Sequence, residues 1–236
     1  MERGLKRYGT GGVVLQVLAL LGCGEAPTTV AVANTAVVAT PAPVATVAGP
    51  EKLVLAFGDS LYAGYGLDRG QSLADAVQRG LRDGGLNATV VNAGVSGDTT
   101  AAALRRLVFS LDNLPRKPDL VVVGLGGNDV LRQLPPAQTR ANLEAMLQLL
   151  RGREIPVMLT GMQAPPNLGP EYTKAFNRIW TDLADQYDAA LYPFILDGVI
   201  GDPSLMLPDR VHPNAKGVAR IAERITPLIA GEIAGE

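Results

Sequence analysis

From Lys52 onward, short apolar runs alternate with longer segments of helical spacing. The runs are too short for helices and lack polar alternation, which is typical of strands buried on both faces of a parallel sheet. We expect strands over 53–57, 88–92, 119–125, 155–160 and 189–192, and helices over 71–83, 99–111, 137–151, 171–187 and 214–229. This order predicts an α/β fold, a three-layer α/β/α sandwich of flavodoxin-like type with about five parallel strands.

The start of the chain has the composition of a lipoprotein-type signal peptide, over residues 1–22. Three basic residues precede a short apolar run at 13–21, which is too short to span a bilayer. The run ends in Leu-Leu-Gly-Cys, which resembles a bacterial lipoprotein cleavage site. That resemblance implies lipid attachment at Cys23; an ordinary secretory signal with an incidental cysteine is the alternative.

Residues 24–50 consist almost entirely of Ala, Thr, Val, Pro and Gly. Such a composition predicts an extended tether, although a disordered leader without a role is the alternative. We therefore expect a signal peptide at 1–22, a lipid anchor and tether at 23–50, and a folded domain at 51–236. The expected location is that of an exported bacterial lipoprotein, anchored to a membrane on its periplasmic or outer face.

Composition excludes several classes of function. The 236 residues suit one domain of ordinary size, and the net charge of −2 without a basic block beyond the N-terminus argues against nucleic-acid binding. Cys23 is the only cysteine, so neither an intrachain disulfide nor a cysteine-based zinc site can form. We expect no metal, no cofactor and a monomer.

Small polar motifs follow three of the expected strands, and a fourth lies near the end of the chain. They are Gly-Asp-Ser at 58–60, Asn-Ala-Gly at 92–94, Gly-Gly-Asn-Asp at 126–129 and Asp-Arg-Val-His at 209–212. In open α/β sheets, ligands bind beyond the carboxyl ends of the strands. The four segments are therefore expected to meet at one edge of the sheet.

The ordered pattern GDS, Gly, GxND, DxxH resembles the SGNH (GDSL-like) hydrolases, from about Leu53 to Leu228. The segments FGDSLYAGYGL, NAGVSGDTT, LGGNDVLR and HPN are most similar to the thioesterase I, lysophospholipase L1 and arylesterase branch. The resemblance implies that Ser60 is the nucleophile of a triad with Asp209 and His212. It also implies an oxyanion hole formed by Ser60, Gly94 and Asn128. Tyr62 departs from the branch, where a small hydroxyl residue is usual, and puts the local shape of the pocket in doubt.

The chemistry of these residues agrees with those roles. Serine needs an adjacent base, and His212 is the only histidine in the chain. A carboxylate such as Asp209, three residues earlier, can fix the tautomer of that base. A backbone N–H at Gly94 and the amide of Asn128 are suitable donors to an oxyanion. The alternatives are an exposed loop histidine, a helix cap at Ser60, and turn or loop-capping roles for the two donors.

Three aspartates near the motifs are assigned no chemical step. Asp59 and Asp129 are expected to hold loops by hydrogen bonds, and Asp98 to cap the helix that follows it.

The expected function is that of a serine esterase acting on small carboxylic esters, with aryl, short-to-medium acyl or lysophospholipid-type groups. Thioesters are a further candidate substrate class. The loops around the motifs carry mostly apolar side chains, which favours apolar substrates: Leu61, Tyr62, Tyr65, Leu67, Val130, Leu131, Met162, Pro165 and Leu168. Two alternatives are an acetylesterase of cell-wall or capsular polysaccharide and a non-catalytic lipoprotein that binds lipid or glycan.

Overall fold

The computed structural model describes residues 47–234. Five parallel strands form one sheet in the order β2-β1-β3-β4-β5. The strands are β1 (Lys52–Gly58), β2 (Ala88–Gly94), β3 (Leu120–Gly124), β4 (Val157–Thr160) and β5 (Ala190–Tyr192). This strand order is the flavodoxin-like one, so the predicted fold class is confirmed.

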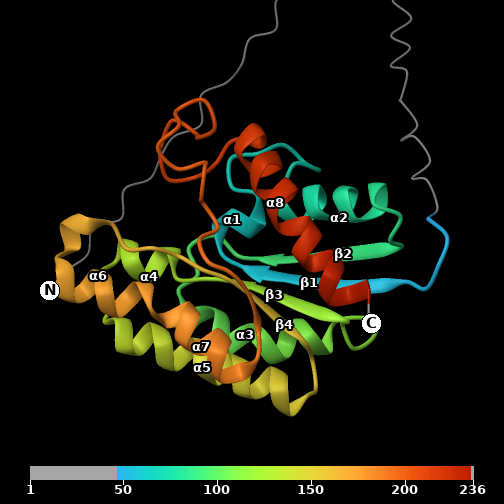
Figure 1. The fold of residues 1–236 in the computed structure, drawn as a ribbon, viewed down its shortest axis with the longest axis horizontal. Helices are drawn as coiled ribbons and strands as arrows, with labels where there is room; N and C mark the ends of the chain where they lie inside the picture. The colour runs from blue at the N-terminus through green and yellow to red at the C-terminus, as the bar shows by residue number, and fades with distance from the viewer. Residues whose placement is uncertain (1–46, 235–236) are drawn as a thin grey trace, which may run out of the picture. The chain divides into compact units, whose positions relative to one another are not determined.

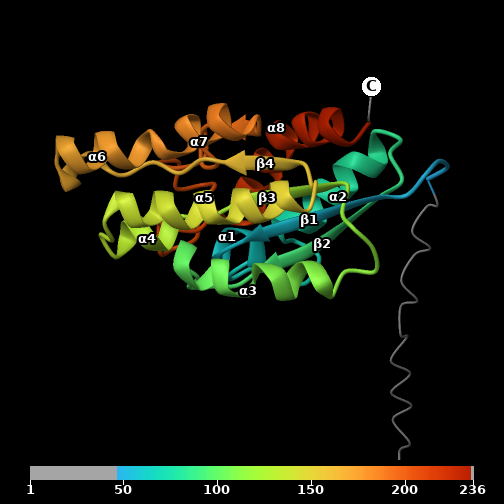
Figure 2. The same ribbon diagram turned by 90° about the horizontal axis from the view of Figure 1, so that it is seen from below.

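Helices cover both faces of the sheet (Figure 1). They are α1 (Ser60–Ala63), α2 (Leu73–Asp83), α3 (Thr100–Asp112), α4 (Gly127–Leu131), α5 (Pro136–Gly152), α6 (Pro170–Asn177), α7 (Ile179–Tyr187) and α8 (Ala215–Ala234), with a short 3₁₀ helix at Pro166–Leu168. Helices α2 and α8 pack together on one face, while α3, α5 and α7 cover the other. Figure 2 shows α3 and α5 side by side across the face that they cover.

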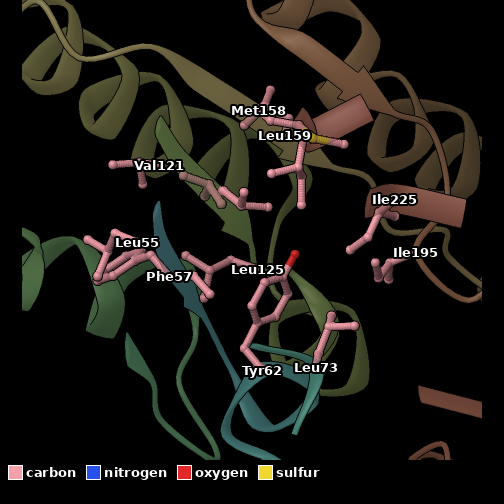
Figure 3. Close-up of a cluster of buried hydrophobic side chains, with 14 of the residues drawn as sticks. Leu55, Phe57, Tyr62, Leu73, Val121, Leu125, Met158, Leu159, Ile195 and Ile225 are labelled. Carbon is pink, nitrogen blue, oxygen red and sulfur yellow. The ribbon is translucent and has the colours of Figure 1, made fainter. Parts of the chain in front are cut away.

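The core lies on both sides of the central strands, because each of these has a strand on either side and a helical layer above and below. All five residues of β3 are buried, and six of the seven in β1. Figure 3 shows part of this core, with Leu55, Phe57, Val121 and Leu159 from three strands. Burying each such side chain stabilises the fold by about 1.5–3 kcal/mol.

Two local predictions need correction. Thr99, and not Asp98, caps α3: its side chain accepts a hydrogen bond from the backbone of Ala102, while Asp98 pairs with Arg106 instead. The helix expected over 171–187 is two helices, α6 and α7, which meet at Arg178.

The expected signal peptide, tether and lipid-attachment residue Cys23 lie outside the described residues. Between residues 47 and 234, no helix is both long enough and apolar enough to cross a membrane.

Candidate active site

Three neighbouring strands end at the same level of the sheet, each in a glycine. Gly58 of β1 pairs in register with Gly94 of β2 and with Gly124 of β3. The segments that follow these strands therefore start from one edge. Ser60 is the first residue of α1, and Asn128 lies in the first turn of α4.

The segment at 209–212, which is near the C-terminal end of the sequence, also lies at this edge. The backbone N–H of Leu207 donates to the carbonyl of His212 over 2.7 Å, and Met206 forms an isolated bridge with Pro213. The Asn214 side chain donates to the carbonyls of Ser204 and Met206 at 2.9 and 3.2 Å. The segment is thereby folded back on itself just before α8 begins.

Ser60, His212 and Asp209 form one hydrogen-bonded row. The His212 Nε2 lies 2.8 Å from the Ser60 Oγ, and the His212 Nδ1 lies 2.7 Å from the Asp209 Oδ2. The other oxygen of Asp209 accepts from the backbone N–H groups of Val211 and His212, at 2.9 and 3.0 Å. Ser60 is at least 149 positions away from Asp209 and His212 in the sequence, yet the structure brings the three side chains together. They have the geometry of a nucleophile, its base and the group that orients the base.

The Asp209 carboxylate is held in its charged form. Burial alone would raise its pKa, but hydrogen bonds from the backbone and ring of His212 and from the backbone of Val211 outweigh burial and lower the pKa to about 2. The carboxylate is therefore ionised throughout the neutral range, as a partner of a histidine that gains a proton must be.

Ser60 gains its position from Asp59, the N-cap of α1. The buried Asp59 side chain accepts a hydrogen bond from the backbone N–H of Leu61 over 3.1 Å. Burial is the main cause that raises the pKa of Asp59 to about 6, and the bond from Leu61 opposes it. At the first position of a helix the backbone N–H has no partner within the helix, so the Ser60 N–H is available to a ligand.

The two other expected donors differ in availability. One hydrogen of the Asn128 amide goes to the carbonyl of Asp98 over 3.0 Å, which leaves the second free. The Gly94 N–H donates to the Asn92 Oδ1 over 2.9 Å and would have to leave it before binding a substrate. A Cβ at Gly94 would lie 2.2 Å from the backbone nitrogen of Ala63, so a glycine is needed there for close packing against α1.

Gly97, in the same loop, is a donor that the sequence analysis missed. Its φ is +85°, its carbonyl accepts from Arg132 over 2.9 Å, and its N–H has no hydrogen-bond partner among residues 47–234. The next residue, Asp98, holds the Asn128 amide, so the loop and Asn128 are directly linked. A second glycine within the same loop was the only signal available in the sequence.

Two buried or half-buried polar residues fix the loops around the site. As expected, Asp129 is structural: it accepts hydrogen bonds from the backbone and hydroxyl of Thr100 and from the hydroxyl of Thr139. The sequence analysis missed Arg106, because an arginine on a helix is normally expected to be exposed to solvent. Its guanidinium donates to the carbonyls of Gly58 and Ala93, at 2.9 and 2.8 Å, and pairs with Asp98.

Tyr62 lies in the core and not in the wall of the pocket, where the sequence analysis placed it. It is 1% exposed, and Figure 3 shows its ring among the core side chains. Its hydroxyl lies 2.8 Å from the Thr160 Oγ1 at the end of β4. The backbone carbonyl of Tyr62 accepts from the Asn92 side chain over 2.8 Å. Tyr62 thus anchors α1, which carries Ser60, to the ends of two strands.

Tyr65 contacts the histidine directly. Its ring centroid lies 4.5 Å from that of His212, with 35° between the ring planes. The contact restricts the tilt of the imidazole ring.

A cavity of about 440 Å³ opens beside Ser60 and His212. Its lining is mostly apolar: Leu61, Val130, Leu131, Met162, Ala164, Pro165, Pro166, Phe194, Leu196, Ile200 and Val211. Of the expected wall residues, Tyr62, Tyr65, Leu67 and Leu168 do not line it, whereas the segment after β5 contributes residues that were not expected. In the described part of the chain, no group of His, Cys, Asp and Glu side chains is arranged to hold a metal ion.

Known proteins resemble this chain over most of the domain. Residues 56–220 match the GDSL-like Lipase/Acylhydrolase family. Esterase TesA of Pseudomonas aeruginosa is 43% identical over 176 residues, which cover 75% of this chain and 87% of that protein. The Arylesterase of Vibrio mimicus is 39% identical over 173 residues, 73% of this chain and 85% of that protein.

A solved structure gives the same result. AlinE4, an SGNH-hydrolase family esterase, is 50% identical, with a TM-score of 0.67 over 78% of this chain and 97% of its own. These similarities confirm the resemblance inferred from the motifs. The chain therefore belongs to the GDSL-like lipase/acylhydrolase family and is a carboxylic ester hydrolase.

Proposed function

We propose that this hydrolase works through a Ser60–His212–Asp209 triad and an acyl-enzyme on Ser60. The observation that carries the proposal is the unbroken row of hydrogen bonds from Asp209 through His212 to Ser60, at 2.7 and 2.8 Å, next to a cavity large enough for a small ester. Such a row supplies both the activated nucleophile and the means to move its proton.

The reaction has two stages. The Ser60 Oγ attacks the ester carbonyl as the His212 Nε2 takes its proton, and Asp209 stabilises the imidazolium that results. The imidazolium then protonates the departing alcohol, and the acyl group stays on Ser60. In the second stage His212 takes a proton from water, the hydroxide attacks the acyl-enzyme, and the proton returns to Ser60 as the acid leaves.

The oxyanion formed at each stage needs aligned donors. The Ser60 N–H and the free hydrogen of the Asn128 amide serve as two of them. Gly94 was the third donor expected from the sequence, but its N–H is already bound to Asn92. We assign the third position to the Gly97 N–H, which has no acceptor among the described residues.

A covalent label tests the nucleophile. A fluorophosphonate should modify the protein at Ser60, read out by mass spectrometry of the labelled peptide, and Ser60→Ala should lose both labelling and turnover. Ser96→Ala is the matched control, because Ser96 is an exposed serine in the Gly94 loop and lines no part of the cavity. Near-native turnover in Ser60→Ala would overturn the triad, and a wild-type protein without any turnover would favour a non-catalytic binding protein.

The substrates that the cavity favours have an apolar acyl or aryl part. Leu61, Met162, Phe194 and their apolar neighbours in the lining offer few aligned hydrogen-bonding groups for a sugar. Each methylene buried there contributes roughly 0.8 kcal/mol until the cavity is full. The kcat/KM for p-nitrophenyl esters should therefore rise from acetate to longer chains and then level off. Acetate as the best substrate by a wide margin, with acetylated glycans better still, would support a polysaccharide acetylesterase instead.

We also propose that the mature protein is attached to a membrane through a lipid on Cys23. The proposal rests on the lipoprotein-like sequence at 20–23 alone. Mass spectrometry of the native N-terminus tests it: a lipid-modified Cys23 is expected, and an unmodified Cys23 or cleavage elsewhere would reject it.

A further inference from the structure

Arg210 has an unusual backbone conformation within the site. Its φ is +59°, in the left-handed region that residues with a side chain seldom adopt. Between residues 47 and 234, three other non-glycine residues have a positive φ: Gln133, Glu154 and Asp188. Each of them lies just after a helix, where this conformation is common. Arg210 follows no helix. It lies between Asp209 and His212, so this unfavourable backbone conformation belongs to the site itself.

Local hydrogen bonds hold Arg210 in this conformation. Its own N–H donates to the carbonyl of Leu207 over 2.9 Å, and the next two N–H groups, of Val211 and His212, donate to Asp209. The same turn that aims His212 at Ser60 therefore also fixes the start of the Arg210 side chain.

Arg210 lines the substrate cavity and is exposed to solvent. Apart from the proposed base His212, Arg210 is the one basic residue among the lining residues, and its guanidinium has no hydrogen bond or ion pair with any residue between 47 and 234. Other arginines near the site are engaged: Arg106 pairs with Asp98, and Arg132 donates to Gly97. The nearby acids are also committed, because Asp209 binds His212 and Asp59 is buried against the backbone of Leu61.

We propose that Arg210 is a specificity-determining residue that recognises an anionic group, a carboxylate or a phosphate, carried by the ester substrate. A guanidinium suits this task because its planar donors match both anions in pairs. The apolar lining then takes the rest of the molecule, so the preferred substrate is an ester with an apolar part and an anion. This inference rests on the proposed function, since it names the substrate class of the same site.

Paired substrates test the proposal. One pair places the anion on the acyl side: 4-nitrophenyl hemisuccinate against 4-nitrophenyl butyrate. The other places it on the alcohol side: 4-acetoxybenzoate against its methyl ester. For each pair the readout is the ratio of kcat/KM for the anionic ester to kcat/KM for the neutral one. In one of the two pairs, Arg210→Gln should lower this ratio about two- to fivefold and Arg210→Glu should lower it further, as expected for a solvent-exposed charge contact.

Controls separate charge recognition from loop geometry. Arg210→Lys should retain part of the selectivity, and Arg220→Gln, which removes an exposed arginine outside the cavity, should leave the ratio at its wild-type value. An unchanged ratio in Arg210→Gln for both pairs would overturn the proposal, even if turnover of the neutral esters falls. A wild-type protein that is not labelled at Ser60 would instead contradict the proposed function.

Discussion

The nucleophile and its base are held in two different ways. Ser60 follows a buried strand and stands between two buried residues, Asp59 at 2% and Tyr62 at 1% exposure. The base lies in a loop in which Asp209 and Arg210 are exposed, and short-range hydrogen bonds to Leu207 and Met206 hold it in place. One half of the reaction centre is thus part of the core, and the other half is a surface turn.

The contrast separates stability from catalysis. Substitutions around Ser60 change the packing of the core, so they should lower stability and activity together. Substitutions in the turn around His212 remove few buried contacts, so they should change activity while the free energy of unfolding stays nearly constant. Substitutions at four positions can break or sharpen this comparison.

The largest expected effect is in the turn. Asp209→Asn should lower kcat by a factor on the order of 10³–10⁴, because an amide can stabilise the wrong tautomer of His212. The Asp209 side chain is 37% exposed, so solvent screening should keep the change in melting temperature small. Steady-state kinetics and thermal unfolding of the same sample check both parts. A large drop in melting temperature would show that the turn is part of the cooperative core.

Tyr62→Ala should give the opposite result. Removing this buried ring should cost about 3–5 kcal/mol of stability. Tyr62→Phe, which loses only the hydrogen bond to Thr160, should cost about 0.5–1.5 kcal/mol. Urea unfolding measures both values. If Tyr62→Ala folds and keeps full stability, the ring does not anchor α1 as described.

Asn128→Ala tests a donor that lies between the two regions. Loss of an oxyanion donor should lower kcat by on the order of 10²-fold or more, whereas loss of the bond to Asp98 should lower stability by only about 1 kcal/mol. Asn113→Ala is the matched control, since Asn113 makes a similar side-chain bond to Phe109 at the C-terminal end of α3, the end opposite to Asp98 and Thr99. Equal kcat values for the two variants would remove Asn128 from the mechanism.

The smallest effect is a pH dependence of stability. The folded protein binds the Asp59 proton more tightly than the unfolded chain does, because its pKa rises from 3.8 to about 6. Stability from this group is therefore present below about pH 4 and is lost as the pH rises through 6. Asp59→Asn keeps an oxygen for the Leu61 N–H but cannot ionise, so it should be more stable than the wild type at pH 8 by about 1–3 kcal/mol. At pH 4 the difference should vanish; a gap that is the same at both values would contradict the shift.

The strands and most helices could be predicted because their apolar runs and periodicity are local properties of the sequence. Boundaries were less certain where two residues compete for one role. Asp98 and Thr99 can both cap a helix, and the choice between them depends on Arg106, eight residues beyond Asp98, which draws that carboxylate away. The expected end of the last helix near 229 was also early, because α8 continues through Pro227 to Ala234.

The site could be predicted in part. Motif order placed Ser60, Asn128 and the 209–212 segment at one sheet edge, as the structure does. Whether a given N–H is free depends on side chains that no local pattern reveals. The Asn92 side-chain oxygen accepts the Gly94 N–H, whereas the Gly97 N–H has no acceptor among the described residues. The direction of Tyr62, and the contribution of Phe194 and Ile200 to the cavity, likewise depend on packing between distant segments.

Because Tyr62 is buried, the residues that can stand at positions 58, 62 and 124 depend on one another. A Cβ at Gly124 would lie 2.0 Å from the Tyr62 ring, and a Cβ at Gly58 would lie 2.4 Å from it. An alanine at either glycine is therefore incompatible with the tyrosine, while a small residue at 62 would leave the glycines facing an unfilled space. We therefore expect an alanine at either glycine to be tolerated only together with a smaller residue at position 62, so the three positions should change together.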